Sequence, residues 1–109
     1  MTKIYAERYK NSFYLECTGH SGYAEQGSDI VCAGVSVLCY ALEKWCLENM
    51  DKIYNHSVKI SEGYFDIAFS GYEEAKTAYD CILGGLKLIA NEYPKFVKVE
   101  DAAVEMSEG

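Results

Sequence analysis

The chain has 109 residues, half of them hydrophobic, which is enough for one domain with a sizeable core. Its 17 acidic residues outnumber its 10 basic residues and give a formal net charge of −7. This charge argues against a general nucleic-acid binder, because phosphate contacts need lysine and arginine, and it suits a basic protein partner. We therefore expect no direct nucleic-acid binding.

The first part of the chain predicts a β-hairpin, a loop and a long helix. Apolar and polar residues alternate over residues 3–8 and 13–18, which indicates two strands. Glycines punctuate residues 19–28 and indicate a loop. An apolar run then predicts a helix from Asp29 to about Met50. Because the first half of this helix is hydrophobic all round, we expect it to be the most buried element.

The second part of the chain predicts another hairpin and another helix. Alternation over residues 56–60 and 64–69 indicates two more strands. His56 opens the first of them, and we expect it to be a surface or strand-end histidine without a partner. Residues 70–73 form a capping-box pattern that opens a helix, and Pro94 ends it.

The second helix and the residues after it carry three further expectations. Gly84 and Gly85 interrupt the helix with a residue type that disfavours it, which suggests a close contact with the first helix. Residues 96–99 predict a short last strand. Residues 100–109 are acidic and rich in small side chains, and they predict a flexible tail.

These elements predict an α+β fold in a single domain, residues 1–109. The order is β-β-α-β-β-α with a short last strand, and we expect one mostly antiparallel or mixed sheet with two helices packed on one face. The other face then needs a polar coat or a partner. Several of the ten tyrosines point outward there, among them Tyr5, Tyr14 and Tyr64, and they suit contact with another protein.

The cysteines and the apolar stretches indicate a reduced, cytoplasmic protein. The five cysteines include no C-x-x-C pair, and an odd number disfavours a disulfide framework. Cys32, Cys39 and Cys46 share a helix face about 10 Å apart, too far for one metal ion, so Cys39 and Cys46 are interpreted as core. We expect no metal, no cofactor and no membrane contact, since the uncharged stretch from residue 30 to 42 is shorter than the roughly 20 residues that cross a bilayer.

Cys32 is the candidate nucleophile. It lies in the first turn of the expected helix, where the helix dipole and a cap at Ser28 or Asp29 favour the thiolate. The chain has two histidines, and the glycine-rich loop lets His20 fold back over the helix start to accept the thiol proton. The alternative for Cys32 is a small buried core residue, which is a common role for cysteine.

One continuous pattern joins the loop to the helix: Gly19-His20-x-Gly22-Tyr23-x-x-x-Gly27-x-Asp29-Ile30-Val31-Cys32-Ala33-Gly34-Val35-Ser36. This pattern resembles the signature of the ribosomal-processing cysteine proteases, the Prp or YsxB-like family. The order of predicted elements extends the resemblance over nearly the whole chain. Ser21 stands where many relatives have alanine, and we expect this exchange to affect only the packing of the loop.

The resemblance implies a cytoplasmic bacterial endopeptidase that acts without a cofactor. It also implies a homodimer, which we expect to use the uncovered sheet face or a sheet edge. It implies Cys32 as nucleophile and His20 as general base, with Asp29 and Ser36 in supporting positions. The remaining loop positions that it implies are Gly19, Gly22, Tyr23 and Gly27. Family members remove the N-terminal extension of a basic precursor, large-subunit ribosomal protein number twenty-seven, and cut after bulky apolar and aromatic residues. An apolar groove is therefore implied.

Two details of the site stay open at the level of the residues. Asp29 either orients His20 or only caps the helix. Ser36 either hydrogen-bonds the thiol or the substrate, or bonds back to its own helix. For the oxyanion of the reaction we expect the backbone amides at the helix start.

Three other functions compete with protease chemistry. A non-enzymatic ribosome-assembly module would dock a basic ribosomal protein on its acidic surface, and would keep its function after Cys32→Ala. A redox-sensing thiol protein would need a resolving thiol near Cys32, for which Cys17 is the candidate because Cys39 lies too far along the helix. A purely structural domain is the third alternative.

Overall fold

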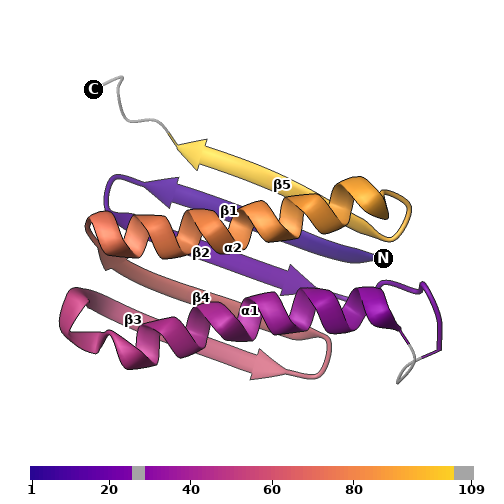
Figure 1. The fold of residues 1–109 in the computed structure, drawn as a ribbon, viewed down its shortest axis with the longest axis horizontal. Helices are drawn as coiled ribbons and strands as arrows, with labels where there is room; N and C mark the ends of the chain where they lie inside the picture. Colours follow the sequence, from indigo (N-terminus) through magenta and orange to yellow (C-terminus); the bar gives the residue numbers. More distant parts are fainter. Residues whose placement is uncertain (26–28, 105–109) are drawn as a thin grey trace.

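The computed structural model describes residues 1–25 and 29–104 and shows one sheet covered on one face by two helices (Figure 1). The elements, in chain order, are β1 Thr2–Tyr9, β2 Ser12–Thr18, α1 Ile30–Glu48, a 3₁₀ turn Met50–Lys52, β3 Ile53–Ser61, β4 Tyr64–Gly71, α2 Glu73–Glu92 and β5 Val97–Val104. The predicted α+β fold is confirmed.

The strand order is β3-β4-β2-β1-β5. β1 pairs antiparallel with β2, β2 with β4 and β4 with β3, whereas β5 pairs parallel with β1, so the sheet is mixed. Alternate side chains of each strand point toward the helices and form the core. The buried hydrophobic residues of the strands are Ile4, Ala6, Phe13, Leu15, Ile53, Phe65, Ile67, Phe69 and Val97.

Helix α1 buries only one of its faces. Val31, Val35, Cys39, Leu42 and Cys46 follow helical spacing and pack into the core. The opposite face is exposed and partly apolar: the exposed fractions are 60% for Ile30, 65% for Val37 and 58% for Leu47, and the exposed ion pair between Lys44 and Glu48 lies on the same side. The expectation that α1 is the most buried element is therefore wrong, because α2 lies beside it and not over it (Figure 1).

The full length of α1 also changes the comparison with a bilayer span. With its 19 residues, α1 is long and apolar enough to cross a membrane by length and composition alone. The comparison made from the sequence used only the uncharged stretch up to residue 42, and it therefore underestimated the length of the apolar helix. In the structure, five side chains of α1 are buried in the core, which is typical of the core helix of a layered fold.

Two predicted boundaries are corrected by the structure. Ser70 belongs to β4, where its hydroxyl lies 2.9 Å from that of Ser12, so it does not cap α2; the cap position is Tyr72, whose side chain makes no capping hydrogen bond. β5 continues to Val104 because it pairs with β1, and residues 100–104 are thus strand and not tail. Residues 105–109 lie outside the described part of the chain.

His56 is not an unpartnered strand-end histidine, as the sequence suggested. It lies inside β3, is half-buried, and its Nε2 is 2.7 Å from Oε1 of Glu43 on α1. The contact between the two helices at Gly85 is confirmed: an ideal Cβ there would lie 3.0 Å from Cδ1 of Leu38, whereas a Cβ at Gly84 would meet no atom within 4 Å.

Candidate active site

Asp29 caps helix α1 and thereby sets the position of Cys32. Its Oδ1 accepts hydrogen bonds from the amides of Val31, at 3.0 Å, and Cys32, at 2.9 Å. These are the donors that a helix start leaves without partners. Cys32 is consequently the third residue of the helix, in its first turn, as expected. Ser28, the other cap candidate, lies outside the described residues.

The second oxygen of Asp29 holds the loop against the helix. Oδ2 accepts hydrogen bonds from the Ser21 hydroxyl and, at 3.2 Å, from the Tyr23 amide. Burial by itself raises the pKa of Asp29, but the hydrogen bonds from Ser21 and Cys32 outweigh it and lower the pKa to about 2. Among the described residues, Asp29 bonds the loop and the helix and not His20, which favours the capping role.

Ser21 has a larger part in the site than its predicted role in loop packing. Its side chain is 2% exposed, and its backbone N–H donates to Sγ of Cys32 over 3.1 Å. An N–H group aimed at the sulfur stabilises negative charge there. Ser21 thus contacts both residues: its amide bonds the sulfur of Cys32, and its hydroxyl bonds the capping carboxylate of Asp29. Nothing in the local pattern points to this, because both partners come from across the loop.

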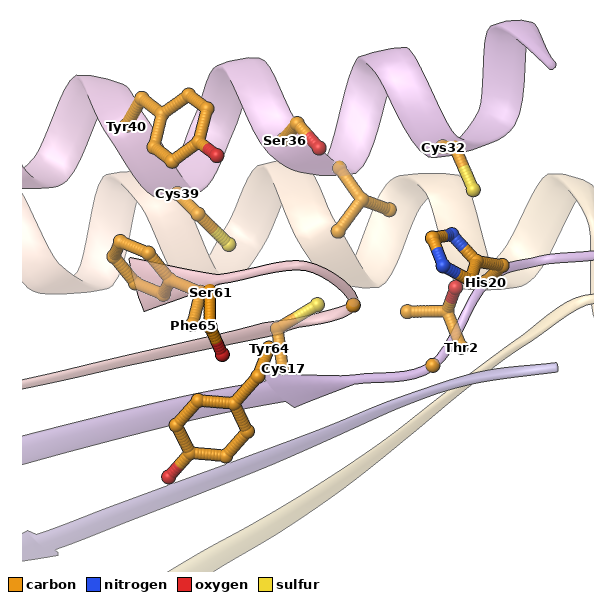
Figure 2. A pocket seen from close by; sticks show the side chains of 13 residues that line it. Thr2, Cys17, His20, Cys32, Ser36, Cys39, Tyr40, Ser61, Tyr64 and Phe65 are labelled. Carbon is orange, nitrogen blue, oxygen red and sulfur yellow. The ribbon is translucent and has the colours of Figure 1, made fainter. Parts of the chain in front are cut away.

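His20 lies opposite Cys32 and is positioned by the second hairpin. The two side chains line the same pocket, and the sulfur of Cys32 points toward the imidazole (Figure 2). The Gly19 amide donates to the Gly63 carbonyl over 2.9 Å, which ties the end of β2 to the β3–β4 turn. Gly63 has φ +69°, and an ideal Cβ there would lie 3.3 Å from Nε2 of His20. Only a residue without a side chain leaves this room. In the sequence Gly63 is interpreted as a turn residue, and nothing there indicates that it belongs to the site.

Two hollows meet at Cys32 and His20. The first, of about 100 Å³, is lined by Thr2, Cys17, Gly19, His20, Cys32, Val35, Ser36, Cys39, Tyr40, Ser61, Gly63, Tyr64 and Phe65 (Figure 2). The second, of about 340 Å³, is lined by His20, Gly22, Ala24, Asp29, Cys32, Ala33 and Ser36. Cys32, His20 and Ser36 border both hollows, so an extended chain can cross the pair of side chains with contacts on either side.

Two further thiols lie in the first hollow. The Cys17 and Cys39 side chains face one another there (Figure 2). The hydrogen bond to Cys17, together with burial, raises the pKa of the Cys39 thiol, so Cys39 keeps its proton at neutral pH. Cys39 is therefore no rival nucleophile. Cys39 borders the same hollow as Cys32 but lies two helical turns farther along α1. Cys17 also borders this hollow, and its role as the resolving thiol of a redox sensor stays a prediction.

Gly19 and Tyr23 hold the loop in its shape. Gly19 has φ +87°, and an ideal Cβ there would lie 2.7 Å from the Met1 carbonyl oxygen. The ring of Tyr23 packs edge-on against Tyr93 and Phe96, each 5.4 Å away between ring centroids. Tyr23 thus anchors the loop to the end of α2. Gly27 lies outside the described residues.

The expected oxyanion donors are already engaged. The amides of Val31 and Cys32 bond the Asp29 carboxylate, and the Ala33 amide bonds the Asp29 carbonyl over 3.0 Å. Donors in such bonds cannot receive a developing oxyanion unless the cap opens. These three helix-start amides are therefore bonded within the cap, whereas the Ser21 amide donates to the sulfur itself.

Comparison with known proteins shows what this arrangement is similar to. The profile of the family described as "Cysteine protease Prp" matches residues 1–98. Two relatives are each named ribosomal processing cysteine protease Prp. That of Mycoplasma genitalium is 29% identical over 92 residues, which are 84% of this chain and 91% of the relative. The relative from Mycoplasma pneumoniae is 27% identical over 101 residues, which are 93% of this chain and 95% of the relative.

A solved structure shares the fold. The crystal structure of the ribosomal processing protease Prp from S. aureus, in complex with a covalently linked product peptide, aligns with a TM-score of 0.82. The alignment covers 93% of this chain and 99% of that one at 20% identity. The five-stranded sheet with two helices on one face is thus an arrangement already seen in a solved protein.

Proposed function

Because the chain belongs to the cysteine protease Prp family and is a hydrolase of peptide bonds, we propose that it removes the N-terminal extension of a basic ribosomal protein precursor, large-subunit ribosomal protein number twenty-seven. The names of its relatives support a ribosomal substrate. The net charge of −7 supports a basic one, since opposite charge speeds the encounter. We also propose that the enzyme works in the cytoplasm.

Cys32 and His20 form the proposed catalytic dyad, and their shared pocket carries this assignment. The Cys32 sulfur attacks the carbonyl carbon of the scissile bond while its proton passes to His20. His20 then gives that proton to the leaving amine as the C–N bond breaks. Water releases the acyl group from the sulfur, with His20 taking a proton from the water and returning one to the thiol.

The Ser21 amide is the proposed oxyanion donor. It lies 3.1 Å from Sγ, and the oxyanion forms on a carbon bonded to that sulfur. A shift of the hydrogen bond from sulfur to oxygen follows the negative charge as it moves during the attack. Ser36 borders both hollows one helical turn beyond Cys32, where its hydroxyl can bond the substrate backbone.

The two hollows suit the two sides of the cut. Val35, Tyr40 and Phe65 give the first hollow an apolar wall, which accepts bulky apolar and aromatic residues before the scissile bond. Ala24 and Ala33 leave room in the second hollow for the residues after it. Cleavage would thus take place where the two hollows meet, over Cys32.

We propose a homodimer that uses the exposed face of α1. The residues that stand out on this face are Ile30, Val37 and Leu47, each more than half exposed. Several large apolar side chains exposed on one helix face are a feature of protein–protein contact surfaces. This differs from the sheet face or edge expected from the sequence.

The deciding experiment is cleavage of the ribosomal protein with its N-terminal extension intact. Wild type, Cys32→Ser and Cys81→Ser are compared, with product masses read by mass spectrometry; Cys81 is an exposed cysteine of α2 and serves as the matched control. We expect one cut near the N-terminus by wild type and Cys81→Ser, and none by Cys32→Ser. Binding without cleavage by wild type would favour the ribosome-assembly module, and cleavage by Cys32→Ser would refute the dyad.

A further inference from the structure

A second cluster of reactive side chains lies away from the catalytic pocket. Glu43 and Cys46 of α1 and His56 of β3 each present one ligand atom, and these atoms all lie within 4.8 Å of one another. Cys46 follows Cys32 by 14 residues, which is about 21 Å along the helix axis. The cluster is therefore separate from the dyad and from both hollows that meet there.

The backbone is shaped to complete this cluster. Glu43 and Cys46 are three residues apart, so they share one face of α1. Ile53 and His56 are also three residues apart, and in a regular strand they would point to opposite faces. The β3–β4 register shifts between Tyr54 and Ser57, and Asn55 adopts φ +55°. This β-bulge adds the extra residue that turns His56 toward α1.

The surroundings of the cluster suit a bound cation. The side chains of His56 and Glu43 are 11% and 15% exposed, and Cys46 is fully buried. Thiolate, imidazole and carboxylate are the three protein ligands that zinc takes, at about 2.0–2.3 Å, which sets neighbouring ligand atoms about 3.3–3.7 Å apart in a tetrahedron. The atoms of the cluster reach that spacing through shifts of about 1 Å, and the slight exposure admits water as a fourth ligand.

We propose that Glu43, Cys46 and His56 bind a divalent transition-metal ion of the zinc type, which fastens the second half of α1 to the edge strand β3. On binding, the Cys46 thiol releases its proton to solvent and the sulfur coordinates as thiolate. The proton that Nε2 of His56 donates to Glu43 also leaves to solvent, so that Nε2 and a carboxylate oxygen of Glu43 bind the metal and the neutral ring carries its one proton on Nδ1. The expectation of no metal considered only the spacing between cysteines, whereas this set needs one cysteine and a histidine from another element.

Cobalt(II) is the probe, because its thiolate complexes absorb through sulfur-to-metal charge transfer. The reduced full-length protein is titrated as wild type, Cys46→Ala, His56→Gln and Cys32→Ala. We expect a charge-transfer band in wild type and Cys32→Ala, its loss in Cys46→Ala, and a cobalt affinity weakened by more than about tenfold in His56→Gln. A band that survives in Cys46→Ala, or one that disappears in Cys32→Ala, overturns the proposal.

Thermal unfolding with zinc gives a second, independent readout. A ligand that binds the folded state raises the midpoint of unfolding. We expect zinc to raise the midpoint of wild type and to leave that of Glu43→Gln and His56→Gln nearly unchanged; these two variants keep the buried Cys46 and so do not depend on repacking the core. Absence of any cobalt band and of any zinc-dependent shift in wild type would show that Glu43 and His56 form an ion pair only.

Discussion

At the scale of single residues, Asp29 links the fold to the chemistry. One of its oxygens caps α1 below Cys32, and the other holds Ser21, whose amide faces the sulfur. Both bonds need the ionised carboxylate as acceptor, and so the pKa of Asp29 lies at about 2, below its ordinary value of 3.8. The loop is thereby joined to the helix by a charge that persists at neutral pH.

The protonation of Asp29 makes part of the stability depend on pH. Because the folded-state pKa is lowered, the contribution is complete above about pH 4 and is lost as pH falls toward 2. Asp29→Asn keeps a good cap residue but not the charge, so we expect it to lower the free energy of unfolding by about 1 kcal/mol at pH 7. Urea unfolding between pH 7 and pH 3 should show the difference from wild type shrinking. A difference that stays constant, or that appears equally for the exposed Asp51→Asn control, would contradict this.

Substitution of Gly63 tests whether the β3–β4 turn positions His20, because its effect on the rate can be measured apart from its effect on stability. In Gly63→Ala, the positive φ costs about 1–2 kcal/mol of stability, and the new methyl group displaces the His20 ring. The 3.3 Å approach requires the ring to move by only part of the roughly 1 Å that can cost on the order of 10²-fold in rate. We expect kcat/KM to fall by about tenfold at a temperature where the variant remains folded. Lower stability with unchanged kcat/KM would show that the β3–β4 turn does not position His20.

At the scale of elements, Gly85 of α2 allows the two helices to lie close together. Gly85 faces Leu38 of α1, and Gly84 faces open space. The two positions are therefore a matched pair on one helix. The sequence suggested a close contact for both, but only the rotation of α2 about its axis assigns it to Gly85.

Alanine substitution distinguishes the two glycines. Gly84→Ala should stabilise the protein by about 0.5–1 kcal/mol, because alanine is the better helix former and meets nothing. Gly85→Ala should gain less, since Leu38 has to move to accommodate a methyl group 3.0 Å away. Thermal or urea unfolding of both variants provides the measurement. An equal gain at both positions would mean that this helix contact is not tight.

At the scale of the whole molecule, the chain forms a slab 19 Å thick with one layer of helices. The helix-free face carries Tyr5, Tyr14 and Tyr64, as predicted. Each of the three donates a hydrogen bond to the carboxylate two residues farther along its strand, namely Glu7, Glu16 and Asp66. These pairs give that face a polar coat. The apolar surface without cover lies instead on the outer side of α1.

This difference between the faces decides where a dimer should form. In Val37→Lys a charge enters the exposed face of α1, where burial against a second copy would be costly. We expect wild type to sediment as a dimer and Val37→Lys as a monomer at micromolar concentration. Leu88→Lys, at an equally exposed position of α2, is the control and should remain a dimer. A monomeric wild type would refute the dimer, and a dimeric Val37→Lys would place it on another surface.

The sequence by itself determined the order of the elements, the capped start of α1 and the placement of Cys32 in its first turn. These features depend on interactions within a few residues, namely strand alternation, helix capping and glycine-rich turns. The same local information led to errors at Ser70 and in residues 100–104, where pairing with β2 and β1 replaced the expected cap and tail.

Only the tertiary structure decided the contacts that join distant segments. Gly63 meets His20 because β4 pairs with β2, and His56 meets Glu43 because a bulge in β3 faces α1. Which side of α1 is covered also depends on where α2 packs, and an all-round apolar sequence holds no information on that choice. Register and packing are set by the whole sheet and both helices together, so they cannot be read from any single stretch of the chain.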